Sequence, residues 1–410
     1  MTVRQKIGVH TTVDGKSVPA GVVFASKGSL TFRYDSEYLE NRAAYDIAPA
    51  LPRMAGSVFH FNGLGPFSDS APDRWGRRLL NRALKRTRVS EIEYLLGVDD
   101  LTRQGALRYV IDGVAQADGS NVPVLTDLPV LLDTADAVSE DRDVSDVALR
   151  RLYKATGSLG GARPKACVYD HGCLWMAKFP KPNGDDWDVI GWEGVTLDLA
   201  RLSGIDVPCF RVLDVQNSGG AHRSVLLTQR FDRFPSSEGP QSMARIPYMS
   251  AMTALDLHDG DGGDWLDLAE YARSVGCDLE ELWHRAVFGA VIGNCDDHLR
   301  NHGFLRDGNG WTLSPAFDIN PEPYDPNMED AHQMALFGDT DVTVDALMRT
   351  ETLELFAVPR ERAIRWCRKL RSILNGIGTL GGARRLDTRS LGIMRSRFEE
   401  AINELDAVTK

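Results

Sequence analysis

The feature that most constrains how this chain can fold is a change in its hydrophobic pattern near Phe231. Up to that residue, short segments of strand character alternate with glycine-containing turns and a few helical segments, among them 74–88 and 193–202. Beyond it, apolar residues recur with helical spacing in the segments 265–275, 279–293, 344–356, 360–374 and 391–408. This pattern predicts an α+β fold with a small β-rich lobe and a larger helical lobe, an arrangement whose cleft is a favoured place for a nucleotide.

The length of 410 residues calls for more than one folding unit, because domains cluster near about 100–200 residues. A polar stretch that contains glycine, aspartate and proline follows the first strand-rich part and is the best linker candidate. We therefore expect four parts, which are an N-terminal α+β subdomain at 1–110, a linker region at 111–135, a β-rich nucleotide-binding lobe at 136–231 and a helical catalytic lobe at 232–410.

Charge and composition narrow the functional classes. The formal net charge is −11, which opposes strong binding of DNA by the chain alone. One basic run at 74–88 has amphipathic helical spacing, and it is either a solvated helix face or a surface for a partner. The six cysteines show no C-x-x-C spacing, so we expect reduced thiols and no zinc site. No apolar run has signal-peptide or membrane-spanning length, so a cytoplasmic protein without membrane contact is expected.

The strongest chemical signal is a pair of polar residues after the helical segment 279–293. Asp296 and Asn301 stand five positions apart, and Asp318 follows a turn flanked by two strand-like segments. Phosphoryl transfer to a hydroxyl needs a carboxylate that accepts the proton and oxygen ligands that hold Mg²⁺ against the phosphates. Protein kinases use the same spacing in their catalytic loop. The motif predicts Asp296 as the base, with Asn301 and Asp318 as metal ligands.

Other interpretations of this segment exist. The acidic residues could cap a helix and start a turn, or the two histidines His298 and His302 could belong to a metal hydrolase, although no H-E-x-x-H motif is present. Asp297 adjoins Asp296, so either carboxylate could be the base, and the spacing favours Asp296.

A second signal is the glycine-rich segment 157–165. Small residues let backbone N–H groups approach phosphate oxygens, and Lys165 adds a positive charge. Lys178 follows in an otherwise apolar strand, as the phosphate-pairing lysine of kinases does. Glu193 could pair with that lysine or could cap the next helix. Without a terminal Gly-Lys-Ser/Thr, the segment is not a Walker A loop.

These motifs together resemble the HipA family, the kinase toxins of bacterial type II toxin–antitoxin modules. The resemblance extends over nearly the whole chain, and includes the segment 105–109, the loop at 158–165, the strand with Lys178, the segment 229–232 and the Asn-x-Asp-x-His-x-x-Asn pattern at 294–301. It implies a two-lobed, protein-kinase-like fold preceded by a small α+β subdomain. Because that subdomain lies within this chain, we do not expect a split toxin, in which the N-terminal subdomain is a separate protein.

The resemblance also implies a role for individual positions. ATP phosphates would contact Gly160, Gly161, Ala162, Arg163, Pro164, Lys165 and Lys178. Adenine would lie at the hinge formed by Gln229, Arg230 and Phe231, while His298 and Asn301 would line the nucleotide site. Phe317 and Asp318 would complete the metal site, and Ser158 matches a position that members can autophosphorylate. Where other members can carry glycine, this chain has Asp297.

The implied substrates are aminoacyl-tRNA synthetases, and the implied partner is a small helix-turn-helix antitoxin through which DNA is bound only indirectly. Two alternatives stay open, which are a non-catalytic kinase-like co-repressor and a small-molecule kinase that uses the same cleft.

Overall fold

The computed structural model describes residues 5–26, 28–117, 119, 122–158, 161, 163–182, 185–308, 310–327 and 330–410. The chain divides into two compact units, each treated separately below. Unit 1 consists of Met1–Pro182, Asp214–His258 and Leu305–Asn309. Unit 2 consists of Asn183–Leu213, Asp259–Phe304 and Gly310–Lys410. The predicted four-part division stays a prediction.

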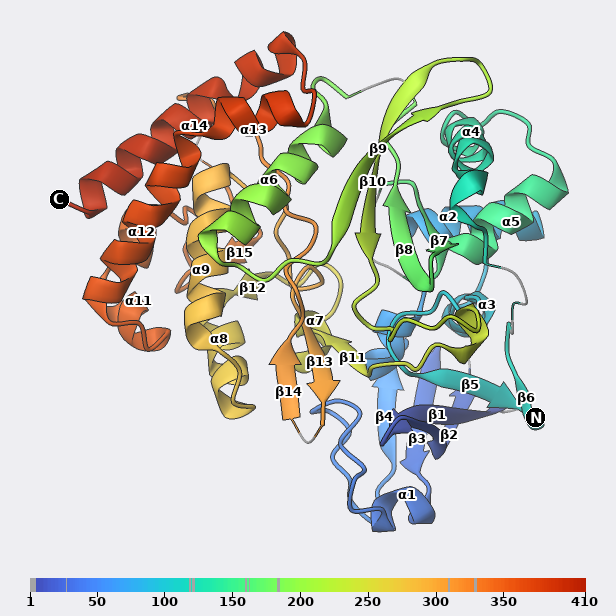
Figure 1. Ribbon diagram of the computed structural model, residues 1–410. Coiled ribbons are helices and arrows are strands. Elements are labelled where there is room, and N and C mark those ends of the chain that lie inside the picture. Colours follow the sequence, from blue (N-terminus) through green and yellow to red (C-terminus); the bar gives the residue numbers. More distant parts are fainter. Residues whose placement is uncertain are drawn as a thin grey trace. The chain divides into compact units, whose positions relative to one another are not determined.

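Unit 1 begins with an antiparallel sheet of six strands in the order β4-β3-β2-β1-β5-β6 (Figure 1). The strands are β1 (Gln5–Val13), β2 (Lys16–Ser26), β3 (Ser29–Tyr34), β4 (Phe59–Asn62), β5 (Arg108–Ile111) and β6 (Val114–Ala115). Buried and partly exposed residues alternate along β1, as expected for a strand with one face on a core. On β3, the buried ring of Phe32 packs against Phe67 of a neighbouring 3₁₀ turn at a centroid distance of 5.5 Å.

The helices and turns of unit 1 are short. They are α1 (Ser36–Glu40), η1 (Gly65–Ser70), α2 (Arg74–Leu84), α3 (Glu91–Gly97), η2 (Leu125–Asp127), α4 (Leu128–Ser139), α5 (Asp146–Thr156), η3 (Pro240–Ser242) and α7 (Ala251–Ala254). The basic run at 74–88 folds mainly as α2, and most of its charges meet acidic side chains nearby. Arg77, Arg78 and Arg86 pair with Glu91, Asp141 and Glu93 at 2.5, 2.8 and 2.7 Å. This helix is therefore largely neutralised within its own unit.

A second sheet has the order β7-β8-β10-β9. Its strands are β7 (Lys165–Asp170), β8 (Cys173–Lys178), β9 (Phe210–Gln216) and β10 (His222–Gln229), and unit 1 also contains β11 (Tyr248–Ser250). The hairpin predicted between Lys165 and Lys178 is present, with Asp170 opposite Cys173. The two linking residues, His171 and Gly172, have φ values of 46° and 80°, as a type I′ turn requires.

Unit 2 is mostly helical, and its short strands are β12 (Gly263–Asp264), β14 (Gly310–Leu313), β15 (Met334–Ala335) and the start of β13 (Gly303–Asp307). Its helices are α6 (Val189–Ser203), α8 (Trp265–Ser274), α9 (Leu279–Ile292), α10 (Val344–Leu347), α11 (Thr350–Leu355), α12 (Arg360–Leu374), α13 (Ile377–Ala383) and α14 (Thr388–Val408). The buried helix α9 contacts α8, α10 and α14, so it lies at the centre of this unit (Figure 1). The helical segment expected at 344–356 is interrupted, because Met348 and Arg349 separate α10 from α11.

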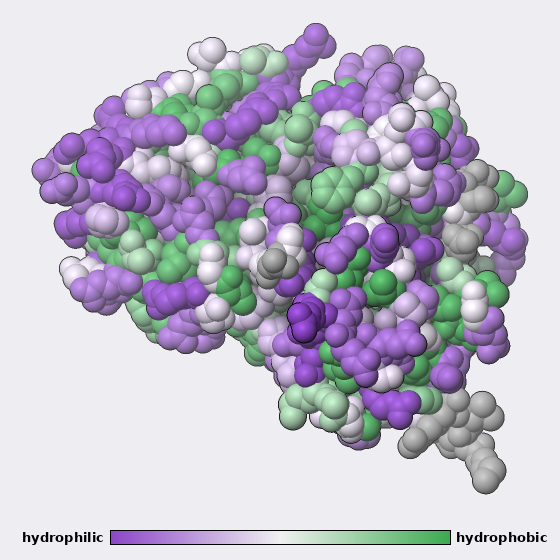
Figure 2. Space-filling model, turned by 60° about the horizontal axis from the view of Figure 1, so that its bottom comes forward, coloured by the Kyte–Doolittle hydropathy of each residue, from purple (hydrophilic) through white to green (hydrophobic). Residues whose placement is uncertain are grey.

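The predicted α+β class, with a sheet-rich part and a helical part, is confirmed. Among the helices that the structure describes, none is both long enough and apolar enough to cross a bilayer. On the face drawn in Figure 2, hydrophilic and hydrophobic side chains are interspersed.

Candidate active site

The loop that carries Asp296 begins at a glycine whose backbone ends helix α9. Asp278 caps the start of α9 by accepting hydrogen bonds from two backbone N–H groups, and Gly293 ends it in the left-handed conformation at φ 65°. A Cβ at Gly293 would lie 2.5 Å from the guanidinium carbon of Arg397. Both the backbone angle and the close approach require glycine here, so the direction of the following loop is fixed.

The two adjacent carboxylates of this loop have different environments. Asp296 is exposed, and its Oδ1 accepts a hydrogen bond of 2.6 Å from Nε2 of Gln333. Asp297 is buried, and its Oδ1 lies 3.0 Å from Nε2 of His302, close enough for an ion pair but poorly aligned for a hydrogen bond. Asp296 can therefore meet a substrate hydroxyl at the surface, while Asp297 belongs to the interior.

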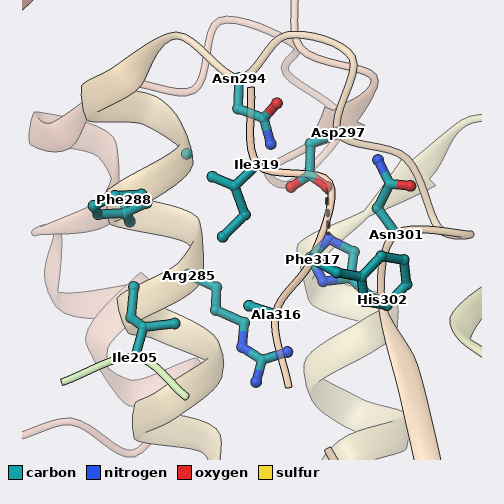
Figure 3. A pocket seen from close by; sticks show the side chains of 11 residues that line it. Ile205, Arg285, Phe288, Asn294, Asp297, Asn301, His302, Ala316, Phe317 and Ile319 are labelled. Atoms are coloured by element: carbon teal, nitrogen blue, oxygen red, sulfur yellow. Dashed lines mark ion pairs between the residues drawn. The ribbon is translucent and has the colours of Figure 1, made fainter. Parts of the chain in front are cut away.

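The Asp297–His302 pair lies in the wall of a small cavity of about 20 Å³, room for roughly one water molecule (Figure 3). Asn301 and Phe317 also lie at this cavity (Figure 3). The remaining lining residues are Ile205, Arg285, Phe288, Gly289, Asn294, Ala316 and Ile319. Two predicted site residues, Asn301 and Phe317, are thus brought together with Asp297 inside unit 2.

The segment around Asp318 is tied to the same loop. The backbone N–H of Asn320 donates to Oδ1 of Asn294 at 3.4 Å, and Oγ1 of Thr196 donates to the carbonyl of Ile319 at 2.6 Å. Asp318 itself has a φ of 57°, an uncommon conformation for a residue with a side chain, and its Oδ1 accepts a 2.7 Å hydrogen bond from Asn320. Backbone strain of this kind clusters at functional sites.

Asn301 and His298 have groups that a ligand could use. The amide nitrogen of Asn301 points to the backbone carbonyl of Asp296 at 3.4 Å, which leaves its side-chain oxygen for another partner. Nδ1 of His298 is buried and has no hydrogen-bond partner among the described residues. A buried polar atom without a hydrogen bond destabilises the fold unless a ligand or a water molecule bonds to it.

Sequence reasoning did not identify Gln333, which reaches the loop from a distant segment. Its backbone N–H donates to the carbonyl of Cys295 at 3.1 Å, in addition to the side-chain bond to Asp296. The next residues form β15, which pairs in parallel with β12. Only the folded chain places this segment beside the loop, and no local motif signals it.

Burial perturbs several titratable groups around this loop. Burial raises the pKa of Glu322, and the nearby carboxylates Asp296 and Asp330 raise it further. Burial also raises the pKa of the Cys295 thiol to about 12. Burial lowers the pKa of His332, although the nearby Asp330 partly offsets this effect.

The glycine-rich segment lies in unit 1, and only part of it can be described, because Gly160 and Ala162 are outside the described residues. Gly161 has a φ of 114°, which favours glycine. Ser158 is buried, and its Oγ accepts a hydrogen bond of 2.9 Å from the backbone of Gln104.

The two predicted phosphate-binding lysines are neighbours across a strand pair. Lys165 on β7 is opposite Lys178 on β8, and both side chains are buried. Nζ of Lys165 pairs with Asp73 at 2.8 Å, and this same aspartate caps α2 by accepting from Gly76. Lys165 therefore links its strand to α2.

The predicted hinge residues lie at the end of β10, with Gln229 as its last residue. Gln229 donates from Nε2 to the sulfur of Cys173 at 3.4 Å, and the ring of Phe231 lies 6.2 Å from that of Tyr248. The side chain of Arg230 is buried and bonded to Asp232 and to the carbonyl of Thr102. Contacts of this residue with a ligand would therefore have to come from its backbone.

A buried charge network holds the hinge in place. Burial by itself would raise the pKa of Asp232, but Arg230 and Arg233 hold it far below its usual value. The backbone N–H of Gly105 donates to this carboxylate at 2.7 Å. These contacts join the loop before β5 to the segment after β10 within unit 1.

Two parts of the chain match known protein domains. Residues 157–376 match the HipA-like C-terminal domain, and residues 12–109 match the HipA N-terminal domain. The chain belongs to the HipA family. The resemblance inferred from the motifs is confirmed by these two matches.

The individual relatives have low sequence identity to this chain. HipA from Shewanella oneidensis, solved with HipB and operator DNA, has a similar fold over 98% of this chain and 99% of its own, with a TM-score of 0.71 and 16% identity. Two Sinorhizobium fredii proteins, Y4dM and Y4mE, both with the word kinase in their names, are each 28% identical over 158 and 137 residues. Those stretches cover 36% and 31% of this chain, and the chain spans only about a third of each relative, 37% and 31%.

Proposed function

We propose that this HipA-family chain is an ATP- and Mg²⁺-dependent protein serine/threonine kinase with Asp296 as its catalytic base. The observation that carries the proposal is the state of Asp296, an exposed carboxylate oriented by Gln333 at the start of an Asp-x-x-x-x-Asn loop. A base of this kind accepts the proton of the attacking hydroxyl, and the rate enhancement that it provides depends on correct orientation of the carboxylate. The buried Asp297 supports the loop from within.

The proposed Mg²⁺ ligands are Asn301 and Asp318. Both offer oxygen donors, which Mg²⁺ prefers, and the side-chain oxygen of Asn301, which has no hydrogen bond within the described part of the chain, fits this use. When bound, the metal would neutralise charge on the phosphates. The hydrogen bond from Asn320 to Asp318 would fix the carboxylate that holds it.

The proposed ATP contacts leave out the side chain of Arg230. Lys178 would pair with phosphate oxygens, and Gly161 and Arg163 would donate their backbone N–H groups. Pro164 has no N–H, so its part would be to hold the shape of the segment, with its carbonyl bonded to the N–H of Phe179. The ammonium of Lys165 already pairs with Asp73, so its first role in this proposal is to position β7 and the lysine opposite. Gln229 and Phe231 would contact adenine, and His298 and Phe317 would line the nucleotide site.

Ser158 is the proposed site of autophosphorylation. The residue is 5% exposed, and its hydroxyl accepts a hydrogen bond from the backbone N–H of Gln104. A Cβ at the neighbouring Gly157 would lie only 2.5 Å from the carbonyl oxygen of Thr102. A phosphate does not fit in this position. Modification therefore requires the loop to leave it, which would remove the phosphate-binding segment from the active arrangement.

The proposed biological setting is that of a toxin in the cytoplasm that phosphorylates an aminoacyl-tRNA synthetase and binds a small helix-turn-helix antitoxin. The Shewanella oneidensis structure contains HipB and operator DNA, which supports an antitoxin partner. The net charge of −11 and the paired arginines of α2 favour indirect DNA contact through that partner.

Expression of the chain alone in a bacterial host tests this function. Wild type should arrest translation and yield a phosphorylated aminoacyl-tRNA synthetase, whereas Asp296→Ala should do neither. Equal toxicity of the two chains would point to sequestration or aggregation instead of catalysis. Arrest without a modified synthetase would mean a different substrate.

A further inference from the structure

Beside the catalytic loop, the fold gathers a thiol, a carboxylate and an imidazole that are far apart in the sequence. The three side chains belong to Cys295, Asp330 and His332, and their ligand atoms all lie within 4.8 Å of one another. Cys295 comes from the loop after α9, while the other two come from the segment before β15. Donors around one tetrahedral ion at bond lengths of about 2.0–2.3 Å lie roughly 3.3–3.8 Å apart, so small side-chain movements would bring the three ligand atoms around an ion.

His332 is held as metal-bound histidines are held. Its side chain is buried, and one ring nitrogen donates a hydrogen bond to the backbone carbonyl of Asn294. That bond fixes the ring and leaves the second nitrogen as an acceptor for an ion. Histidine ligands of metals almost always have such an outer partner.

Asp330 is also oriented from outside the cluster. The buried guanidinium of Arg397 holds its carboxylate by two hydrogen bonds of 2.5 and 2.8 Å. Nε of Arg397 donates to the carbonyl of Glu322 at 2.8 Å, so the arginine itself is locked. Each carboxylate oxygen keeps a further lone pair that could face a metal.

The charges around the cluster favour a cation. Besides burial, the carboxylates of Asp330, Glu322 and Asp296 raise the pKa of the Cys295 thiol, while the guanidinium of Arg397 lowers it. Negative charge therefore outweighs positive charge among these groups. A divalent ion would offset this excess.

We propose that Cys295, Asp330 and His332 form a binding site for a divalent transition metal of the zinc class. A thiolate and an imidazole select such ions over Mg²⁺, which prefers oxygen donors. Binding would release the thiol proton to solvent, and three protein ligands would leave a fourth coordination position open. The ion would join the catalytic loop to the segment that carries Gln333.

Cobalt substitution tests the site on the full-length protein. One Co²⁺ per chain should bind, with the near-ultraviolet charge-transfer band of a cobalt–thiolate bond, and Zn²⁺ should displace it. The variants Cys295→Ser and His332→Gln should weaken Co²⁺ binding at least about tenfold, and Cys295→Ser should also lose the band. Far-ultraviolet circular dichroism checks that both variants are folded.

Two matched controls distinguish this site from Co²⁺ bound at a surface thiol or at the proposed Mg²⁺ ligands. Cys209→Ser removes an exposed thiol of the same unit and should keep the band. Asp318→Asn alters the proposed Mg²⁺ site and should also keep it, as should an excess of Mg²⁺. Absence of stoichiometric binding in wild type, or a band that survives Cys295→Ser, would overturn the proposal, as would loss of the band in Cys209→Ser.

Discussion

The side-chain amide of Gln333 donates a 2.6 Å hydrogen bond to Oδ1 of Asp296, across a sequence separation of 37 residues. We expect this bond to orient the base. Gln333→Leu should lower phosphate transfer from ATP by about tenfold or more, because hydrogen bonds to charged groups contribute about 1.5–3 kcal/mol. Gln333 is exposed, so the thermal unfolding midpoint should change little.

The matched variant Gln333→Glu distinguishes orientation from packing. Two carboxylates at hydrogen-bond distance share a proton, so the acid limb of the pH–rate profile should move to higher pH. Gln333→Leu should lower the whole profile without that displacement. If both variants transfer phosphate at the wild-type rate, Gln333 does not position the base.

The pair Lys165–Asp73 should stabilise unit 1. Both side chains are buried, with 1% and 7% exposure, and Nζ lies 2.8 Å from Oδ2. Lys165→Met should therefore lower the free energy of unfolding by about 3–5 kcal/mol, since it leaves a buried carboxylate unpaired. Urea denaturation measures this loss.

A double-mutant cycle isolates the pair. Asp73→Ser removes the charge but keeps a residue that can cap α2. The free energy of unfolding of the double variant should fall by clearly less than the sum of the decreases in the two single variants. Additive losses would show that the two charges do not interact in solution.

His284 should make unit 2 sensitive to acid. Burial lowers its pKa from 6.5 to about 4, and its ring stacks on Trp366 at 4.3 Å. Because the folded pKa is the lower one, the unfolded chain binds more protons between these values. The contribution of the neutral His284 to the free energy of unfolding is therefore complete above about pH 6.5. It is lost progressively toward pH 4, by up to roughly 3 kcal/mol.

Thermal unfolding of His284→Phe across pH 4–7 checks this expectation. The variant should show a flatter dependence of the unfolding midpoint on pH than wild type. His171→Gln changes a histidine with 92% side-chain exposure and should keep the wild-type slope. An unchanged slope in His284→Phe would assign the acid sensitivity to other groups.

Local patterns in the sequence predicted much of the fold. The hairpin at Lys165–Lys178 follows from strand residues on either side of His171-Gly172, and α12 (Arg360–Leu374) follows from unbroken helical spacing. The break between α10 and α11 was missed, because the apolar spacing continues across it while Thr352 bonds to the carbonyl of Ala346. The spacing of apolar residues shows which side of a helix is buried, and it does not reveal such a local change in the direction of the chain.

The candidate site was predictable only where its residues lie in one segment. Asp296, Asn301 and Asp318 are near one another in the chain, so their spacing carried the signal. Gln333 and His332 come just before β15, and the hydrogen bonds of Gln333 to Cys295 and Asp296 form only in the folded chain, so spacing cannot reveal them. The environments of Asp296 and Asp297 differ because the turn after Gly293 directs one outward and the other inward.

Phosphate transfer from radiolabelled ATP with Mg²⁺, compared between Asp296→Asn and Asp297→Asn, tests the central claim most directly. Asp296→Asn should lose transfer by about 10²-fold or more, since it removes the proposed base while the exposed position tolerates the amide. Asp297→Asn should keep measurable transfer and instead unfold at a lower temperature, because it breaks the buried pair with His302. Wild-type transfer by Asp296→Asn, or loss of transfer in a folded Asp297→Asn alone, would contradict Asp296 as the catalytic base.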